Sequence, residues 1–186
     1  MEYKVKGGFS CDRQSKYDFT ASTVSFLSQW AGDKKIEIVF KEQDKDGCLV
    51  PFDSVDSYDK SRTDLIMYFN GYPYVIELKE RWGKYTSDFY GKEGDNEGWM
   101  LNIDKVTELE KVNNAIPLYV NLYPDGVVRI WNLNKISDYQ TIIKNIHKTT
   151  VLKSEAKLQE RYELWNKDST TIPRLKGEPS NGVWTS

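Results

Sequence analysis

The stretch that decides the fold is residues 64–79, DLIMYFNGYPYVIELK. Asn70 and Gly71 stand between two runs of aliphatic and aromatic residues, a pattern typical of a β-hairpin with a two-residue type I′ turn. If this dipeptide forms the loop, the resulting register places Asp64 directly opposite Glu77. Opposed residues of a hairpin share one face, so we expect the two carboxylates to lie about 5 Å apart at Cβ.

Lys79 adds a positive charge to this acidic pair, because it lies two residues after Glu77 and therefore on the same face. Two carboxylates at this distance repel by about 3 kcal/mol at an effective dielectric of about 20. The strands that carry them are apolar on both faces, as in a sheet covered on both sides. A cation between the carboxylates, or protonation of one of them, relieves such repulsion. The alternative is a solvated hairpin end with Lys79 as its counter-charge.

Composition limits the classes of protein. The chain has 186 residues and a net charge of −2, which predicts one domain without general attraction to nucleic acid or acidic membranes. The first residues, MEYKVKGGFS, lack the apolar segment of a signal peptide, and no stretch is long enough to span a membrane. Cys11 and Cys48 give neither a disulfide framework nor a CxxC spacing. We therefore expect a cytoplasmic protein that does not enter a membrane.

The ligands available restrict the metal. The single histidine, His147, stands among lysines, where a solvated role is expected. With one histidine and two cysteines, an N/S zinc site is not expected. Any metal should be a hard cation bound by oxygen, Mg²⁺ or Mn²⁺.

The first half of the chain predicts a helix and a strand before the hairpin. Residues 18–31 carry apolar side chains at helical spacing and end at Gly32. Residues 35–41, KIEIVFK, alternate as in a strand. Residues 42–62 read as loop or irregular strand. Within them DKDG at 44–47 resembles a fragment of a calcium loop but lacks the remaining ligands, which favours a turn.

The second half predicts further helices and strands. Residues 80–98 show no period, and a connection of this length is usually functional or disordered. Residues 99–113 have the pattern of an amphipathic helix. A strand that begins at Pro117 is expected to reverse at 124–126 into VVRIWNL. We predict that 135–166 are mostly helical, which completes a domain of 1–166, and that 167–186 form a poorly ordered tail.

The order helix, strand, strand with Asp64, strand with Glu77-Leu78-Lys79, helix, strand resembles the PD-(D/E)XK nuclease superfamily. The resemblance covers about residues 17–133, and its motif is an Asp on one strand and (D/E)-x-K on the next. Thr63 stands where the motif has its proline. The resemblance implies an α/β fold with a restriction-endonuclease-like core, in αβββαβ order, whose central mixed sheet has about four to five strands flanked by helices.

The resemblance also implies an activity, a Mg²⁺- or Mn²⁺-dependent endo- or exonuclease that hydrolyses DNA phosphodiester bonds. Asp64, Glu77 and the backbone carbonyl of Leu78 would bind the metal, which lowers the pKa of bound water. Lys79 would orient the hydroxide or stabilise the phosphorane oxygens. Lys105 corresponds to a lysine that often follows on the next helix, although Lys111 and simple solvation compete with this role.

Asp18 is the nearest substitute for the glutamate that many members carry on the first helix as a further metal ligand. The alternative for Asp18 is a helix cap, since aspartate near a helix N-terminus interacts well with free amides.

Nucleic-acid contacts are predicted near the motif, because cations meet phosphates and aromatic rings stack on unpaired bases. The candidates are Arg62, Arg81, Trp82, Lys84 and Lys92. The acidic residues of the same loop neutralise much of this charge, and the alternative is a structural role in which the aromatic rings fold over the edge of the core. The alternative functions are a non-catalytic nucleic-acid-binding or protein-interaction module on the same fold and an RNA-directed nuclease. Duplex, branched and single-stranded substrates fit equally, and a homodimer is compatible with the chain.

Overall fold

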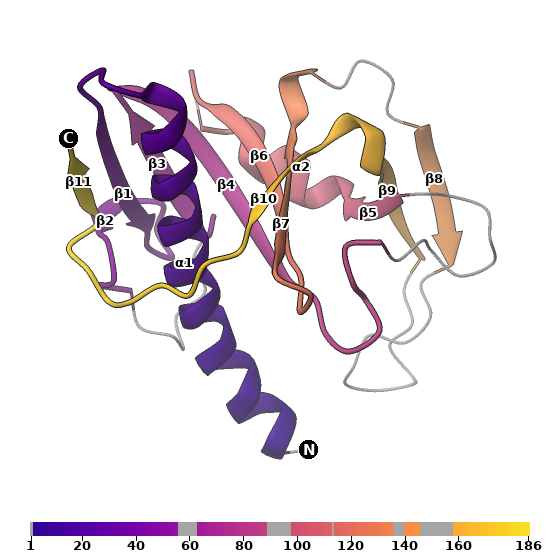
Figure 1. The fold of residues 1–186 in the computed structure, drawn as a ribbon. Coiled ribbons are helices and arrows are strands. Elements are labelled where there is room, and N and C mark those ends of the chain that lie inside the picture. Colours follow the sequence, from indigo (N-terminus) through magenta and orange to yellow (C-terminus); the bar gives the residue numbers. More distant parts are fainter. Residues whose placement is uncertain (1, 56–62, 89–97, 113, 136–139, 146–157) are drawn as a thin grey trace.

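A computed structural model describes residues 2–55, 63–88, 98–112, 114–135, 140–145 and 158–186 (Figure 1). The first half of the chain forms α1 (Glu2–Ala31), β1 (Glu37–Gln43), β2 (Leu49–Pro51), β3 (Leu65–Phe69) and β4 (Tyr72–Glu80). The second half forms β5 (Gly98–Asn102), α2 (Ile103–Glu110), β6 (Ile116–Leu122), β7 (Val127–Asn132), η1 (Leu133–Lys135), β8 (Gln140–Asn145), β9 (Leu158–Trp165), η3 (Asn166–Asp168), β10 (Thr170–Pro173) and β11 (Val183–Thr185).

The main sheet has eight strands in the order β10-β7-β6-β4-β3-β1-β11, with β2 paired to β1. Only β4 and β6 run parallel among the pairs described, so the sheet is mixed. The predicted α/β class is confirmed, whereas the expected size of about four to five strands is wrong. The sheet is larger because β7 and β10 extend it at one side and β2 and β11 at the other.

The central hairpin has the predicted register. Asn70 and Gly71 have φ angles of 47° and 80°, the left-handed values that a type I′ turn requires. The ladder runs from Phe69 opposite Tyr72 to Leu65 opposite Ile76. The side chain of Asn70 also accepts a hydrogen bond from the backbone N–H of Glu37 (2.7 Å), which ties the turn to β1.

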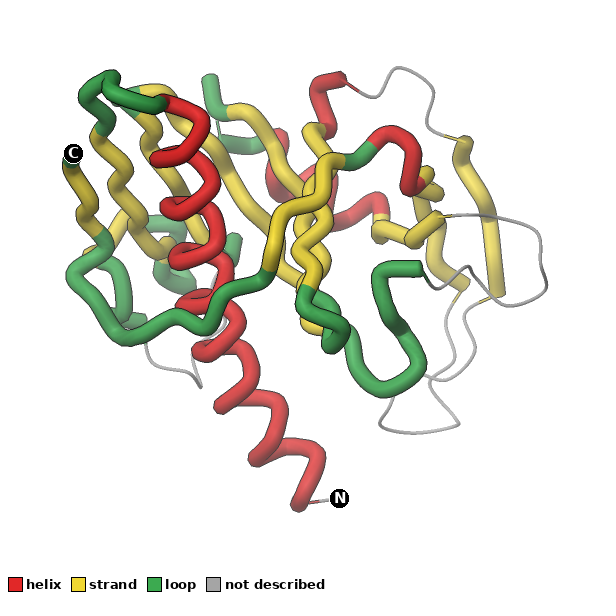
Figure 2. The backbone as a smooth tube through the Cα atoms, viewed as in Figure 1, coloured by secondary structure: helices red, strands yellow, loops and turns green. Residues whose placement is uncertain are grey.

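The two faces of the main sheet are covered by different elements (Figure 2). On one, the α1 face, Ile76 and Leu78 pack in a cluster with Phe19 of α1. On the other, the α2 face, Val75 packs in a cluster with Leu109 of α2. Successive strand residues point to opposite faces. Asp64 and Glu77 therefore belong to the α2 face.

Helix α1 contains the predicted helix of 18–31 but begins much earlier, at Glu2. It ends as expected at Gly32, whose φ is 58°. A buried ion pair holds it on β1, with Lys16 Nζ 3.0 Å from Oε1 of the fully buried Glu42. None of the helices in the described part of the chain is long and apolar enough to cross a membrane.

The predicted helix over 135–166 is wrong. The described part of this stretch consists of Lys135 at the end of η1, strands β8 and β9, and Asn166 at the start of η3, and residues 136–139 and 146–157 lie outside the described part. Strand β9 pairs with both β5 and β8 in a second, three-stranded sheet. Strand β5 also replaces the start of the helix expected over 99–113, which leaves α2 shorter than predicted. Pairing between distant segments overrides the helix-forming composition here.

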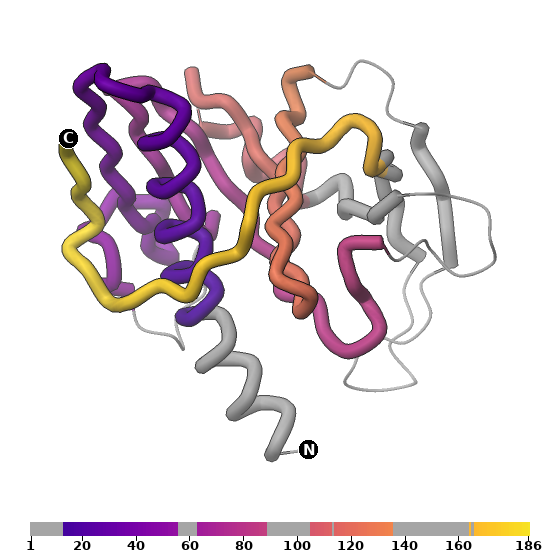
Figure 3. The backbone as a smooth tube through the Cα atoms, viewed as in Figure 1, coloured from indigo at the N-terminus to yellow at the C-terminus, as the bar shows by residue number. Residues whose placement is uncertain are grey.

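The expected poorly ordered tail of 167–186 is also wrong, because it contains β10 and β11. Strand β10 pairs with β7 and β11 pairs with β1, at the two sides of the sheet. Figure 3 follows the yellow segment between them across α1. At Gly177 an added Cβ would lie 1.8 Å from the backbone oxygen of Tyr17, so only glycine allows this close crossing.

Candidate active site

Asp64 and Glu77 meet at the end of the β3–β4 ladder. The backbone N–H of Leu78 donates a 2.8 Å hydrogen bond to Oδ2 of Asp64, which fixes the aspartate beside β4. The ladder ends with Leu65 opposite Ile76, and the same register extended by one residue would place Asp64 opposite Glu77. Glu77 is only 6% exposed. The structure therefore places the two acids close together, with Asp64 bonded to the residue next to Glu77.

The environment of Glu77 makes its ionisation costly. Burial is the main cause that raises the pKa of Glu77 to about 7, and the charge of Asp64 raises it further. The positive charges of Lys105 and Lys79 act in the opposite direction. A carboxyl group with this pKa is partly protonated at neutral pH, and a nearby cation would favour release of the proton.

Lys105 reaches the acidic pair from α2. Its Nζ lies 3.3 Å from Oε1 of Glu77 in an ion pair. Burial lowers the pKa of Lys105, but the charges of Glu77 and Asp64 outweigh that effect and raise it overall. Val106, next to Lys105, is buried in the cluster of the α2 face and so fixes the helix on the sheet. Packing of α2 thus aims the ammonium group at Glu77.

Lys79 stands on the same face as Glu77 and is exposed. The structure thus brings together four of the residues that the sequence predicted as a site: Asp64, Glu77, Lys79 and Lys105. The site combines the buried Glu77 and the half-buried Asp64 with two lysines that are both exposed to solvent.

A hard cation would have few protein ligands at this site. Asp64 and Glu77 supply carboxylate oxygens, and the backbone of Leu78 adjoins both. The ammonium group of Lys105 lies beside Glu77 and compensates its negative charge, as a bound metal ion would also do. In the described residues no group of three or more His, Cys, Asp or Glu side chains could hold a metal ion. Two carboxylates with backbone and water suit Mg²⁺, which usually keeps several waters.

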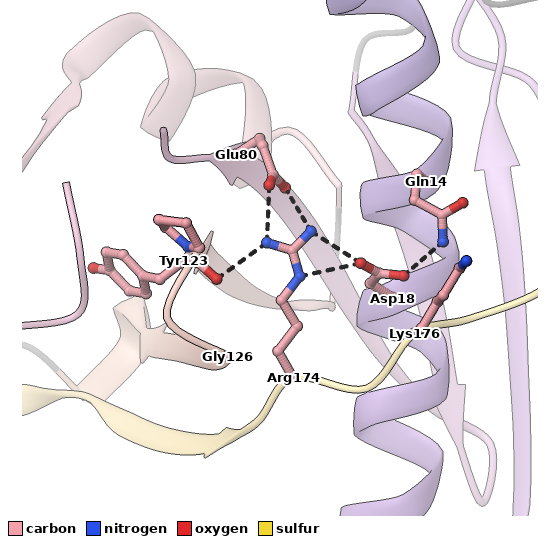
Figure 4. Close-up of a pocket in the computed structure, with 8 residues that line it drawn as sticks. Gln14, Asp18, Glu80, Tyr123, Gly126, Arg174 and Lys176 are labelled. Atoms are coloured by element: carbon pink, nitrogen blue, oxygen red, sulfur yellow. Dashed lines mark hydrogen bonds and ion pairs between the residues drawn. The ribbon is translucent and has the colours of Figure 1, made fainter. Parts of the chain in front are cut away.

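Asp18 lies in a different cluster, on the α1 face (Figure 4). Its Oδ2 is 2.9 Å from Nη2 of Arg174, whose Nη1 lies 2.8 Å from Oε1 of Glu80. Gln14 and the backbone N–H of Gly177 donate to Oδ1 of Asp18. The structure therefore does not bring Asp18 to the Asp64–Glu77 pair. The helix-cap interpretation is wrong as well, because Asp18 lies well inside α1.

A cavity of ≈ 420 Å³ opens beside this cluster. It is lined by Gln14, Asp18, Glu80, Tyr123, Pro124, Gly126, Arg174 and Lys176. All three nitrogens of the Arg174 guanidinium bond to Asp18, Glu80 or the carbonyl of Tyr123, so the arginine joins the C-terminal segment to α1 and β4.

Arg81 is held by side chains that the sequence did not predict. Its Nε donates to Oδ1 of Asn121 (3.1 Å) and its Nη2 to the hydroxyl of Tyr119 (2.8 Å). Asn121 is fully buried and donates to the hydroxyl of Tyr123 (3.2 Å). In the parallel β4–β6 pair Tyr119 neighbours Glu77, so the network continues the face of the acidic pair. A lone Asn in the apolar run LYVNLY was the available signal.

The other predicted contact residues differ in position. Trp82 and Lys84 are exposed on the segment after β4. Arg62 and Lys92 lie outside the described residues, as does His147. The DKDG segment forms the expected turn, in which Oδ1 of Asp44 accepts from the backbone N–H groups of Asp46 and Cys48.

We compared the chain with models of known protein families, with curated proteins and with solved structures. None of the three comparisons found a match.

Proposed function

We propose that the protein is a metal-dependent nuclease that hydrolyses DNA phosphodiester bonds. The observation that carries this proposal is the buried Glu77, whose pKa is raised to about 7, close to Asp64 and beside two lysines. Placing two carboxylates together in a buried environment is electrostatically costly. Such an arrangement is typical of a site in which a bound cation compensates their negative charge. Mg²⁺ or Mn²⁺ is the cation that oxygen donors favour.

The order of the secondary-structure elements supports the same proposed function. Helix α1, strands β1, β3 and β4, helix α2 and strand β6 follow one another in the order helix, strand, strand, strand, helix, strand, with β2 and β5 as additions. In the PD-(D/E)XK superfamily this order surrounds the acidic pair. A restriction-endonuclease-like core within the larger sheet is part of the proposal.

The residues have distinct roles in the proposed reaction. Asp64 and Glu77 would bind the cation, which supplies an activated water and polarises the phosphate. Lys79 is exposed on the face of Glu77, where it can donate to a phosphate oxygen as negative charge develops. Lys105 holds the carboxylate of Glu77 in place through the 3.3 Å ion pair. It is a positioning residue, since it would act through Glu77.

One observation favours a second candidate, a nucleic-acid-binding module without cleavage. The described residues supply only a pair of acids at the site and no larger metal-binding group. Against it, a binding surface has no need of a buried carboxyl group with a raised pKa. RNA as the substrate in place of DNA is the remaining variant of the proposed function.

Cleavage assays test the proposal directly. Linear, branched and single-stranded DNA and single-stranded RNA are incubated with the protein in Mg²⁺, Mn²⁺ or EDTA. We expect cleavage of DNA with either metal, none in EDTA, and loss of cleavage in Asp64→Asn, Glu77→Gln and Lys79→Ala. Glu110→Gln is the matched control, because Glu110 is an exposed acidic residue at the end of the same helix, α2. Metal-dependent cleavage that persists in all three site variants would refute the proposed site.

A further inference from the structure

We propose that Trp82, Gly83, Lys84 and Tyr85, the aromatic loop, bind unpaired bases of single-stranded DNA next to the acidic pair. This inference rests on the proposed nuclease function and names its substrate class. The loop begins three residues after Lys79, just beyond the end of β4, so a DNA strand bound to it would lie close to the proposed point of cleavage.

Both ends of the aromatic loop are anchored. Before it, the backbone N–H of Arg81 donates to the carbonyl of Leu122 (2.9 Å), and the guanidinium bonds to Asn121 and Tyr119. After it, the N–H and hydroxyl of Ser87 donate to Oδ2 of Asp125 (3.1 and 2.5 Å). These contacts fix the loop on β6 and on the β6–β7 turn.

Arg129 of β7 strengthens the second anchor. Its Nη2 donates to the carbonyl of Ser87 (2.9 Å), and its Nη1 donates to Ser169 (2.8 Å). The two ends of the loop are therefore held in place by the sheet. Because the loop is already ordered, binding a ligand costs less conformational entropy.

The tip of the aromatic loop is a tight turn that displays its rings. The N–H of Tyr85 donates to the carbonyl of Trp82 (3.1 Å), and Gly83 has the left-handed φ of 59°. Trp82 is 56% exposed and Tyr85 is 41% exposed. By contrast, Trp131 and Tyr119 on the neighbouring strands are buried. Part of each ring of the loop is therefore accessible to a ligand, more of Trp82 than of Tyr85.

The charges around the rings suit a phosphate backbone. Lys84 Nζ lies 5.5 Å from the centre of the Tyr85 ring, so a cation and an aromatic face are offered together. Lys79 is exposed on the strand that leads to the loop. Of two nearby acids, Glu80 pairs with Arg174, which it shares with Asp18, whereas Asp125 keeps its charge and accepts hydrogen bonds from Ser87. Asp88 remains as an exposed negative charge at the far end of the segment.

The chemistry distinguishes unpaired from paired bases. Exposed aromatic rings bind nucleobases by stacking, irrespective of sequence. In a duplex the faces of the bases are already stacked on one another. An aromatic side chain can therefore stack on a base only where the strand is unpaired. An anchored pair of rings beside a cleavage site therefore favours a single strand, an overhang or a flap over a continuous duplex.

Binding of fluorescein-labelled oligonucleotides, followed by anisotropy in EDTA, tests the inference without cleavage. The probes are an oligo-dT of about 20 nucleotides, a blunt duplex of equal length and oligo-U RNA. We expect oligo-dT to bind at least 10-fold more tightly than the duplex, and Trp82→Ala with Tyr85→Ala to remove about 10-fold of that affinity. Trp82→Phe should retain most of it.

Trp30→Ala is the matched control. Trp30 is 69% exposed but lies at the other end of the hairpin, against Phe69, with ring centroids 6.4 Å apart. Its loss should leave oligo-dT binding unchanged. Equal binding of duplex and oligo-dT, or no effect of the Trp82 and Tyr85 substitutions, would overturn the inference. Tighter binding of oligo-U than of oligo-dT would overturn its assignment to DNA.

Failure of this inference is distinguishable from failure of the proposed function. Metal-dependent cleavage of duplex DNA that does not depend on Trp82 and Tyr85 would overturn the aromatic loop and leave the nuclease intact. Specific binding of oligo-dT through the loop, without cleavage of any substrate, would overturn the nuclease and support the loop.

Discussion

Asp64 accepts a hydrogen bond from the backbone N–H of Leu78 at 2.8 Å, and so lies close to Glu77 at the end of the β3–β4 ladder. The hydrogen bond fixes one carboxylate against the strand that carries the other. Together with burial, this arrangement raises the pKa of Glu77 to about 7. The acidic pair is thus both well positioned and electrostatically unfavourable, and the predictions below use these two properties.

Replacement of Asp64 by Asn should separate position from charge. Asn keeps an oxygen that can accept from the N–H of Leu78 but removes the charge that raises the pKa of Glu77. We expect the pKa of Glu77 to fall, stability at pH 8 to be maintained or increased, and metal-dependent cleavage to decrease by roughly 100-fold or more. NMR titration of the Glu77 side chain and cleavage rates measure the two effects. A strong loss of stability would contradict the electrostatic account.

Stability should decrease with rising pH because of Glu77. Its folded pKa of about 7 exceeds the unfolded value of 4.5, so the folded state holds the proton more tightly between these two values. The contribution is fully present below pH 4.5 and is lost as pH rises through 7. Its full size is on the order of 3 kcal/mol.

Urea unfolding at several pH values measures this contribution. The stability of Glu77→Gln relative to wild type should increase as the pH rises from 4.5 to 8, because the amide cannot ionise. A relative stability that stays constant over this range would show that the pKa of Glu77 is not raised.

Lys105 should control the ionisation of Glu77. Lys105→Met removes a charge that lowers the pKa of Glu77, so that pKa should rise further. The acidic limb of the pH–rate profile should then move to higher pH, and cleavage at pH 7 should fall by about tenfold or more. Lys111→Met is the control on the same helix, since Lys111 is exposed and pairs with Glu108. Equal profiles for the two variants would exclude the positioning role of Lys105.

The cluster of Asp18, Glu80 and Arg174 should act on stability and not on chemistry. Arg174→Met leaves two mostly buried carboxylates without their shared cation, a change that typically costs about 3–5 kcal/mol. Lys176→Met, an exposed residue beside the same cavity, should change stability by about 0.5 kcal/mol or less. Urea unfolding measures both.

Asp18→Asn tests the same cluster from its other side. It should destabilise the fold while cleavage per folded molecule stays unchanged. If the Asp18→Asn variant folds but loses cleavage, Asp18 would instead have a role in the proposed active site.

Local signals in the sequence predicted the part of the fold that carries the site. The Asn70-Gly71 dipeptide defines the turn, and because side chains alternate along a strand, the turn also defines which residues face each other. The opposition of Asp64 and Glu77 follows from that register alone. Lys105 was expected for a different reason, since it stands where the resembled superfamily often has a lysine on the helix after the (D/E)-x-K strand.

Long-range contacts account for what the sequence did not reveal. The segment of β9, LQERYELW, is rich in helix-forming residues, yet it forms a strand because β5 and β8 pair with it on either side. The C-terminal segment carries the prolines and glycines of a loose tail, but Arg174 meets Asp18, 156 residues away in the chain. The anchoring of Arg81 on Asn121 likewise joins residues 40 positions apart.

Isothermal titration of Mg²⁺ or Mn²⁺ at pH 7, in two buffers of different ionisation enthalpy, tests the central claim most directly. If Asp64 and Glu77 hold the cation, binding must displace the proton that Glu77 carries part of the time. We predict release of about half a proton per metal bound, and Glu77→Gln should bind at least tenfold more weakly, without that release. Metal binding without proton release, and with equal affinity in wild type and Glu77→Gln, would contradict the account.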